Sequence, residues 1–104
     1  ILAEATDQQT RSAAEFRLME LDSLDERDAI RAALHAQKEK TGKCPSRLSE
    51  ILPLLRSVQL PSGKDFRINA SSELVDPSDA PYLLDTEACD VLIDRKRSKL
   101  GILN

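Results

Sequence analysis

The sequence is poor in aromatic residues: Phe16, Phe66 and Tyr82 are the whole set among 104 residues, and tryptophan is absent. A core without many rings must be built mostly from Leu, Ile, Val and Ala. The core is also thin, because a domain of this size buries only about two-thirds of the surface that its unfolded chain exposes. The shortage further excludes a nucleic-acid surface in which aromatic rings alternate with Lys and Arg.

A surplus of one charge is also lacking, since 15 Lys and Arg oppose 18 Asp and Glu for a net charge of −3. We therefore expect no nucleic acid among the partners. No apolar run approaches the ~20 residues that span a bilayer, and no signal peptide opens the sequence, so we expect no direct membrane contact. Because the chain opens at Ile1 rather than Met, we expect a mature or excised fragment of a longer protein.

Histidine occurs once, at His35, and glycine only three times. A His-assisted nucleophile needs the imidazole beside a Ser or Cys and an orienting acid, whereas His35 lies among alanines in a predicted helix. Cys44 lacks such a partner for the same reason. The three glycines form no phosphate-cradling loop. We therefore expect that the protein is not an enzyme and that it uses no cofactor.

Cysteine occurs twice, at Cys44 and Cys89, outside any Cys-x-x-Cys pair. A single histidine cannot complete a zinc ligand set with them, so we expect no metal. Two interpretations remain open. Either the pair forms a disulfide, as in small exported domains with weak cores, or both are buried free thiols. The first favours the cell envelope or periplasm, and the second favours the cytoplasm.

The first forty residues predict a helix, over residues 6 to about 40, with Thr6 or Asp7 as its starting cap. Ser23 and Glu26 match a capping box, which would begin a second helix at Ser23. However, the apolar residues keep the same helical spacing before and after Ser23, and neither Gly nor Pro interrupts the segment. We predict one long helix, bent near Ser23 at most, with the capping box a solvent-facing coincidence.

Two apolar stripes run along this helix at a spacing of 100° per residue. The first stripe, which is our candidate for a partner-facing surface, consists of Ala14, Leu18, Leu21, Ala29, Ala32 and Ala36. The second lies about a third of a turn away and consists of Phe16, Met19, Ile30, Ala33 and Leu34. The alanines of the first stripe suit close packing against a neighbouring helix.

Gly42 and Pro45 predict a corner after the long helix. Beyond it, Ser46 is a good N-cap for a short helix, and Pro53 should kink or end that helix. The remaining segments alternate between turn residues and short apolar runs, which predicts strands at residues 65–69, 73–75, 82–84 and 90–94.

These elements predict an α+β fold with one long helix, one short helix and a small antiparallel sheet. We expect a single domain over residues 1–104. It divides into the long helix (1–42), the corner with the short helix (43–56) and the sheet with its loops (57–104). The expected core residues are Leu48, Ile51, Leu55, Phe66, Ile68, Val91 and Ile93.

Three charged groups have both a functional and a structural interpretation. The acidic cluster Glu20, Asp22, Asp25, Glu26 and Asp28 lies on a straight helix, which does not wrap an ion, and we interpret it as a solvated face. The loop 76–85 is a better calcium candidate through Asp76, Asp79 and Asp85, although turn-forming Asp residues are the default. The basic run 95–99 could contact phosphate or an acidic partner, and we interpret it as a solvated or edge-protecting device.

The stretch from Ala29 to Leu55 resembles a bacterial pattern: a long helix ending in a Gly corner, then Pro-Ser-x-Leu-x-Glu-Ile, then Leu-Pro and a short sheet. It is similar to the globular part of type II secretion and type IV pilin-like proteins, whose helix and corner match Ile30, Leu34, Gly42, Pro45, Leu48 and Ile51. The pilin-like pattern has an aromatic where this chain has Cys44, and this departure is one reason to expect a bond to Cys89.

The same stretch also resembles the small α+β cap that follows helical repeats of the tetratricopeptide type. There, a segment such as Ala13 to Leu21 looks like the closing helix of the array. A pilin-like subunit implies self-assembly through the long helix, and a repeat cap implies a scaffold that holds partner proteins.

Both resemblances imply a module for protein–protein interaction or assembly in a bacterial cell-envelope or scaffold complex, with other protein subunits or a second copy as partners. The alternative is an accessory domain that binds a ligand or calcium through the loop 76–85.

Overall fold

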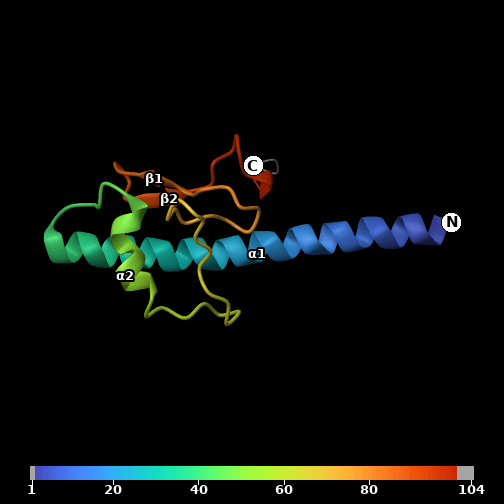
Figure 1. The fold of residues 1–104 in the computed structure, drawn as a ribbon, viewed down its shortest axis with the longest axis horizontal. Coiled ribbons are helices and arrows are strands. Elements are labelled where there is room, and N and C mark those ends of the chain that lie inside the picture. The colour runs from blue at the N-terminus through green and yellow to red at the C-terminus, as the bar shows by residue number, and fades with distance from the viewer. Residues whose placement is uncertain (1, 101–104) are drawn as a thin grey trace.

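The structure is a computed structural model that describes the backbone of residues 2–100 and the side chains of residues 12–100. Helix α1, Leu2–Thr41, is one uninterrupted helix of 40 residues (Figure 1). The prediction of a single long helix is confirmed. Its start lies at Leu2, so neither Thr6 nor Asp7 begins it, and the side chains of both lie outside the described residues.

Helix α1 ends at a glycine, as predicted. Gly42 has a φ of 80°, a left-handed conformation that strains residues with a Cβ atom. Its amide donates a hydrogen bond of 2.7 Å to the Lys38 carbonyl, which satisfies one of the free carbonyls at the helix end. The chain therefore turns back here and lies alongside α1 (Figure 1).

Two short helices follow the corner: the 3-10 helix η1, Leu48–Ile51, and helix α2, Leu52–Leu55. The predicted cap Ser46 is wrong, because Arg47 is the N-cap of η1. The Glu50 carboxylate reaches back and accepts bonds from the amides of Ser46 and Arg47, at 2.7 and 3.1 Å.

The predicted short helix changes from the 3-10 helix η1 to helix α2 directly before Pro53 and continues to Leu55, so the expectation that it ends at Pro53 is wrong. Pro53 lies in the first turn of α2, a position where a proline is tolerated. Helix α2 continues from there to Leu55.

Strands β1, Leu83–Asp85, and β2, Asp90–Leu92, form an antiparallel pair with Leu84 opposite Val91. The strands expected at 65–69 and 73–75 shrink to isolated bridges, which join Ile68 to Leu74 and Val75 to Pro81. Pro81 has no amide proton, so it cannot donate a hydrogen bond to extend the pairing with Val75. Ser72 has a φ of 62° and lies in the tight turn between the two expected strands. The predicted α+β class is confirmed, with a smaller sheet than expected.

The core lies between the second stripe of α1, the two short helices and the β hairpin. Its buried members are Ile30, Ala33, Leu34, Ile51, Leu55, Leu74, Tyr82, Cys89 and Val91. Leu48, Phe66 and Ile93 are partly buried against this cluster. Most of the expected core residues therefore contribute, although Tyr82 and the Leu74 bridge residue were not among them.

Ile68 is an exception, because 51% of it is exposed. Neighbouring side chains of an extended segment point to opposite sides. Arg67 points toward α1, where its Nε lies 3.4 Å from Glu26, so the adjacent Ile68 points away from the core. The sequence pattern alone favoured the apolar residue for the inner side.

The compact half covers only part of α1, whose N-terminal part extends well beyond it (Figure 1). The Cα trace accordingly measures 59 × 28 × 24 Å along its principal axes. None of the described helices combines the length and the apolar character that crossing a bilayer would require.

Cys44 and Cys89 form a disulfide, with Cα atoms 5.6 Å apart. The bond joins the corner after α1 to the turn that leads into β2. Cys89 is 1% exposed and belongs to the core, while Cys44 is half-buried. Of the two interpretations of the cysteines, the structure supports the disulfide.

Reducing this disulfide should lower the free energy of unfolding by about 4 kcal/mol, because it closes a long loop and restricts the unfolded chain. Urea unfolding of the oxidised protein and of protein reduced under denaturing conditions measures the difference. A double variant, Cys44→Ala with Cys89→Ala, is the control and should not respond to reductant. Equal stabilities of oxidised and reduced wild-type protein would contradict the assignment, as would two free thiols in the untreated protein.

Candidate functional site

The first stripe of α1 faces solvent, on the side of the helix away from the core. Of its large side chains, Leu18 is 61% exposed and Leu21 is 42% exposed. Ala14, Ala32 and Ala36 are exposed as well, and Ala29 is half-buried. The two predicted stripes therefore differ in exposure, because Ile30, Ala33 and Leu34 of the second stripe are buried.

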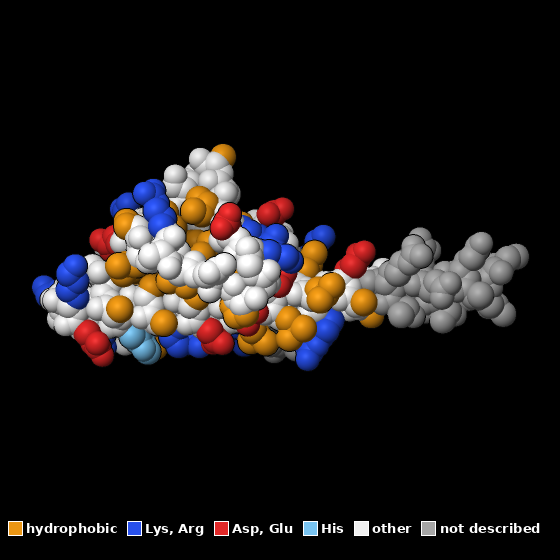
Figure 2. Space-filling model, turned by 90° about the horizontal axis from the view of Figure 1, so that it is seen from below, with side chains coloured by type: hydrophobic (Ala, Val, Ile, Leu, Met, Phe, Trp, Pro, Cys, Tyr) orange, Lys and Arg blue, Asp and Glu red, His pale blue; other side chains and the backbone are white. Residues whose placement is uncertain are grey.

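The compact half adds apolar side chains to this face. A shallow groove of about 290 Å³ lies between α1 and the chain around α2, and it is lined by Ala29, Ala32, Ala33, Ala36, Leu54 and Val58. Val58 is 39% exposed. Figure 2 shows this side of the molecule, where hydrophobic side chains follow the long helix and acidic ones lie among them. We call the first stripe together with Leu54 and Val58 the apolar face.

Sequence reasoning missed Leu54, Val58 and the exposed Leu24. Leu24 is 46% exposed and lies one turn beyond Leu21, so its i, i+3 spacing could have added it. Leu54 and Val58 could not have been found in this way, because only the fold brings them beside α1.

A second, buried cluster joins α1 to the C-terminal half through hydrogen bonds. The Tyr82 hydroxyl donates to the Glu26 carboxylate at 2.7 Å and lies 2.9 Å from the Ser23 hydroxyl. Ser23 is fully buried and Glu26 is 2% exposed. Two of our interpretations are therefore wrong. Ser23 and Glu26 do not form a capping box on the solvent side of the helix, and Glu26 does not belong to a solvated acidic face.

Basic side chains close the open side of this cluster. Arg67 lies 3.4 Å from Glu26 and 3.5 Å from Asp22, and the Lys64 ammonium bonds Asp22 at 2.9 Å. These ion pairs hold the loop that follows Leu60 against α1. Glu26 is thus a buried carboxylate with a hydrogen-bond donor on one side and a cation on the other.

Burial raises the pKa of Glu26 above its usual value of 4.5, although the Tyr82 hydrogen bond and the Arg67 charge both oppose the rise. Burial also raises the pKa of Tyr82, the nearby Glu26 charge adds to the rise, and the Ser23 hydrogen bond opposes it. Tyr82 therefore stays protonated and remains the donor in this pair. The arrangement suits a structural anchor between two segments.

The acidic loop 76–85 uses its carboxylates locally. Asp76 is 1% exposed and accepts bonds from the Ser78 amide at 2.7 Å, from the Ala80 amide at 3.2 Å and from the Ser98 hydroxyl. Asp85 accepts the amides of Glu87 and Ala88. Asp79 is exposed. Within residues 12–100, no group of three or more His, Cys, Asp or Glu side chains converges to hold a metal ion.

The basic run 95–99 begins with a turn that Asp94 organises. The hydrogen bond from Arg97 is the largest cause that holds the pKa of Asp94 below its usual value, and backbone amides contribute as well. Ser98 is buried against Asp76, so it does not belong to a solvated run. Arg95, Lys96 and Lys99 are exposed.

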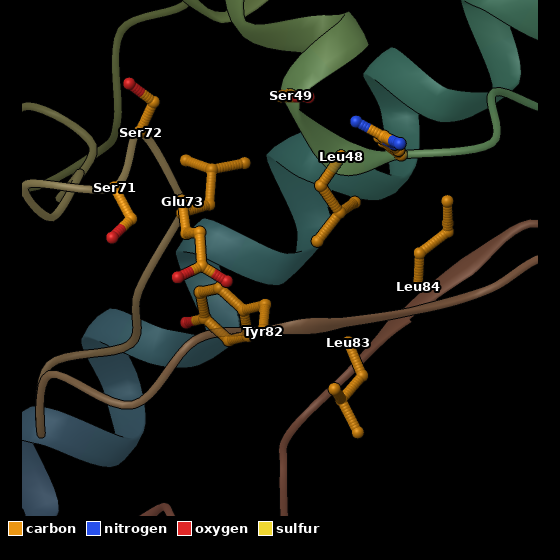
Figure 3. Close-up of a pocket in the computed structure, with 10 residues that line it drawn as sticks. Leu48, Ser49, Ser71, Ser72, Glu73, Tyr82, Leu83 and Leu84 are labelled. Carbon is orange, nitrogen blue, oxygen red and sulfur yellow. The ribbon is translucent and has the colours of Figure 1, made fainter.

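A cleft of about 340 Å³ lies between η1 and the first strand of the hairpin. Figure 3 shows the side chains around it, from Leu48, Ser49, Ser71, Ser72, Glu73, Tyr82, Leu83 and Leu84. Glu73 bonds Asn69 at 3.2 Å. His35 is exposed on α1, and in the described part of the chain it makes no hydrogen bond to a Ser or an acid.

Comparisons of the chain with family models, with curated proteins and with solved structures found no match.

Replacing Tyr82 by Phe should lower the free energy of unfolding by about 1–3 kcal/mol, because Glu26 and Ser23 lose their shared buried partner. Urea unfolding measures the change. Ser72→Ala, an exposed hydroxyl at the rim of the cleft in Figure 3, is the control and should change stability little. A Tyr82→Phe variant as stable as the wild type would mean that the buried pair does not anchor the loop.

The Glu26 carboxylate should make stability depend on pH. Because its pKa is raised in the folded state, the folded protein binds a proton more readily than the unfolded chain does. Its contribution is fully present below pH 4.5 and is lost as pH rises through the folded pKa. Gln mimics the protonated Glu26 side chain, so the unfolding free energy of the wild type minus that of Glu26→Gln should rise as pH falls from 7 toward 4.5. A signed difference that stays flat, or that falls as pH falls, would contradict the raised pKa.

Proposed function

We propose that this protein is a non-catalytic module that associates with other protein subunits through the apolar face of α1. The observation that carries the proposal is the exposure of Leu18 and Leu21 on α1, a helix whose N-terminal part extends beyond the compact half. Large apolar side chains that share one helix face and lie in water are typical of interaction sites. The shallow groove beside Val58 extends this face onto the compact half.

The shape of the face favours a helix as the partner element. Alanines at positions 29, 32 and 36 repeat at helical spacing and leave room for another helix to approach closely. A rod with one apolar side and a compact body at one end serves equally a pilin-like subunit and a cap that closes an array of helical repeats. Both belong to bacterial assemblies, and both use the long helix for contact.

The disulfide favours an oxidising compartment, so we place the assembly in the cell envelope or periplasm. The calcium-binding alternative has less support, because the Asp76 carboxylate is already occupied by Ser78, Ala80 and Ser98. Asp85 is likewise bonded to backbone amides of its own turn.

Site-specific photo-crosslinking in cells that make the protein tests this proposal. A photoreactive amino acid at position 18, 21 or 32 should give discrete, light-dependent adducts on a denaturing gel. The same amino acid at position 72 or 87, in exposed turns away from the apolar face, is the matched control and should give none. Adduct yields from the helix positions no higher than from the control positions would refute the proposed interface.

A further inference from the structure

A second surface lies between α1 and the outer side of the β hairpin. Its charge is opposite to that of the exposed part of α1. It is an open groove of about 780 Å³. Leu83 and Leu92 pair across the two strands and are 40% and 45% exposed, so they form an apolar floor. Arg27 from α1, with Arg95 and Lys96 beyond β2, provides basic side chains along the groove.

The acidic side chains in this groove are already neutralised. Asp90 accepts a bond from Arg31 at 2.7 Å, and Asp94 accepts one from Arg97 at 2.6 Å. By contrast, Arg27, Arg95 and Lys96 take part in none of the ion pairs within residues 12–100. The groove therefore offers unpaired positive charge around exposed leucines. Its complement is a segment that carries leucines and carboxylates together.

One exposed segment of this same chain has that composition. On α1, between Glu15 and Asp25, Leu18, Leu21 and Leu24 are all exposed. Glu15 is exposed as well and Asp25 is half-buried, while Arg17 of the same segment is paired with Glu20 at 3.9 Å. The segment cannot enter the groove of its own molecule, because Arg27 and Arg31 of the groove belong to the same continuous helix.

We propose that the groove receives the Glu15–Asp25 segment of a second copy of this chain, so that copies associate head to tail. This inference rests on the proposed function and names its partner. The exposed leucines of one copy then cover Leu83 and Leu92 of the next, and carboxylates meet Arg95 and Lys96. A head-to-tail contact joins two different surfaces, so the copy at each end keeps one free surface and the chain of copies can grow.

Two variants, each with one surface disabled, test this contact in the purified oxidised chain. Leu18→Lys with Leu21→Lys disables the helix segment, and Arg95→Glu with Lys96→Glu disables the groove. Ile68→Lys and Lys99→Glu are matched controls, because both positions are exposed and outside the two surfaces. Analytical ultracentrifugation at low salt measures the size of the species, and circular dichroism checks that each variant is folded.

Wild type and both controls should form species larger than dimers as concentration rises, and added salt should weaken them because screening reduces the charge attraction. Each disabled variant alone should be monomeric, with its association weakened at least about tenfold. An equimolar mixture of the two disabled variants should form dimers and stop there, because only one intact pair of surfaces remains.

Two results would overturn the head-to-tail contact. Wild type that stays monomeric at about 1 mM, where even a weak contact would show, excludes association between copies. A groove variant that assembles as the wild type does would show that the helices pair with one another and leave the groove empty. In both cases the crosslinking experiment decides the proposed function separately. The proposed function stands if positions 18, 21 and 32 still crosslink in cells, and it fails together with the head-to-tail contact if they do not.

Discussion

The hydrogen bond between Tyr82 and Glu26 is the contact on which the arrangement of the C-terminal half depends. Up to residue 100, where the described part of the chain ends, that half has little regular structure, chiefly two short helices, one strand pair and two isolated bridges. Few ladder hydrogen bonds hold it together, so side-chain contacts to α1 must fix its position. Tyr82 adjoins β1 and reaches Ser23 and Glu26 on the helix, while Arg67 and Lys64 fasten the preceding loop beside the same point. The disulfide then fixes the far end of the hairpin to the corner after α1.

Local rules predicted the elements whose cause is local. The long helix, its glycine stop and the two strands follow from helix-forming residues, from the left-handed turn at Gly42 and from the alternation around Val91. Spacing also predicted the two stripes of α1. The alanines of the first stripe favoured it as the partner-facing one, but spacing alone does not determine which stripe the rest of the chain buries. That choice follows from the core residues, above all Ile51 and Leu55, which come later in the chain and pack on the second stripe.

The failures share a different cause, which is a partner far away in the sequence. Ser23 and Glu26 have the spacing of a helix cap, and nothing near them shows that Tyr82 will bury them. Ile68 alternates correctly for a strand, yet Arg67 takes the inner side because acidic residues on α1 attract it. The basic groove was missed for the same reason, since Arg27 and Lys96 meet only in the folded chain. A buried polar contact depends on two residues that can lie far apart in the sequence, whereas a sequence pattern describes one segment at a time.

The unequal burial of the two cysteines makes their bond resistant to exchange with cellular thiols. Cys44 is the less buried residue of the pair, so attack by an incoming thiolate is expected at its sulfur, which would make Cys89 the leaving group. Cys89 lies in the apolar core, where a thiolate is poorly solvated and therefore leaves reluctantly. Attack from the other direction requires the hairpin to open first. The oxidation state acquired at folding should thus persist for as long as the core stays closed, so small reductants would act slowly on the folded molecule.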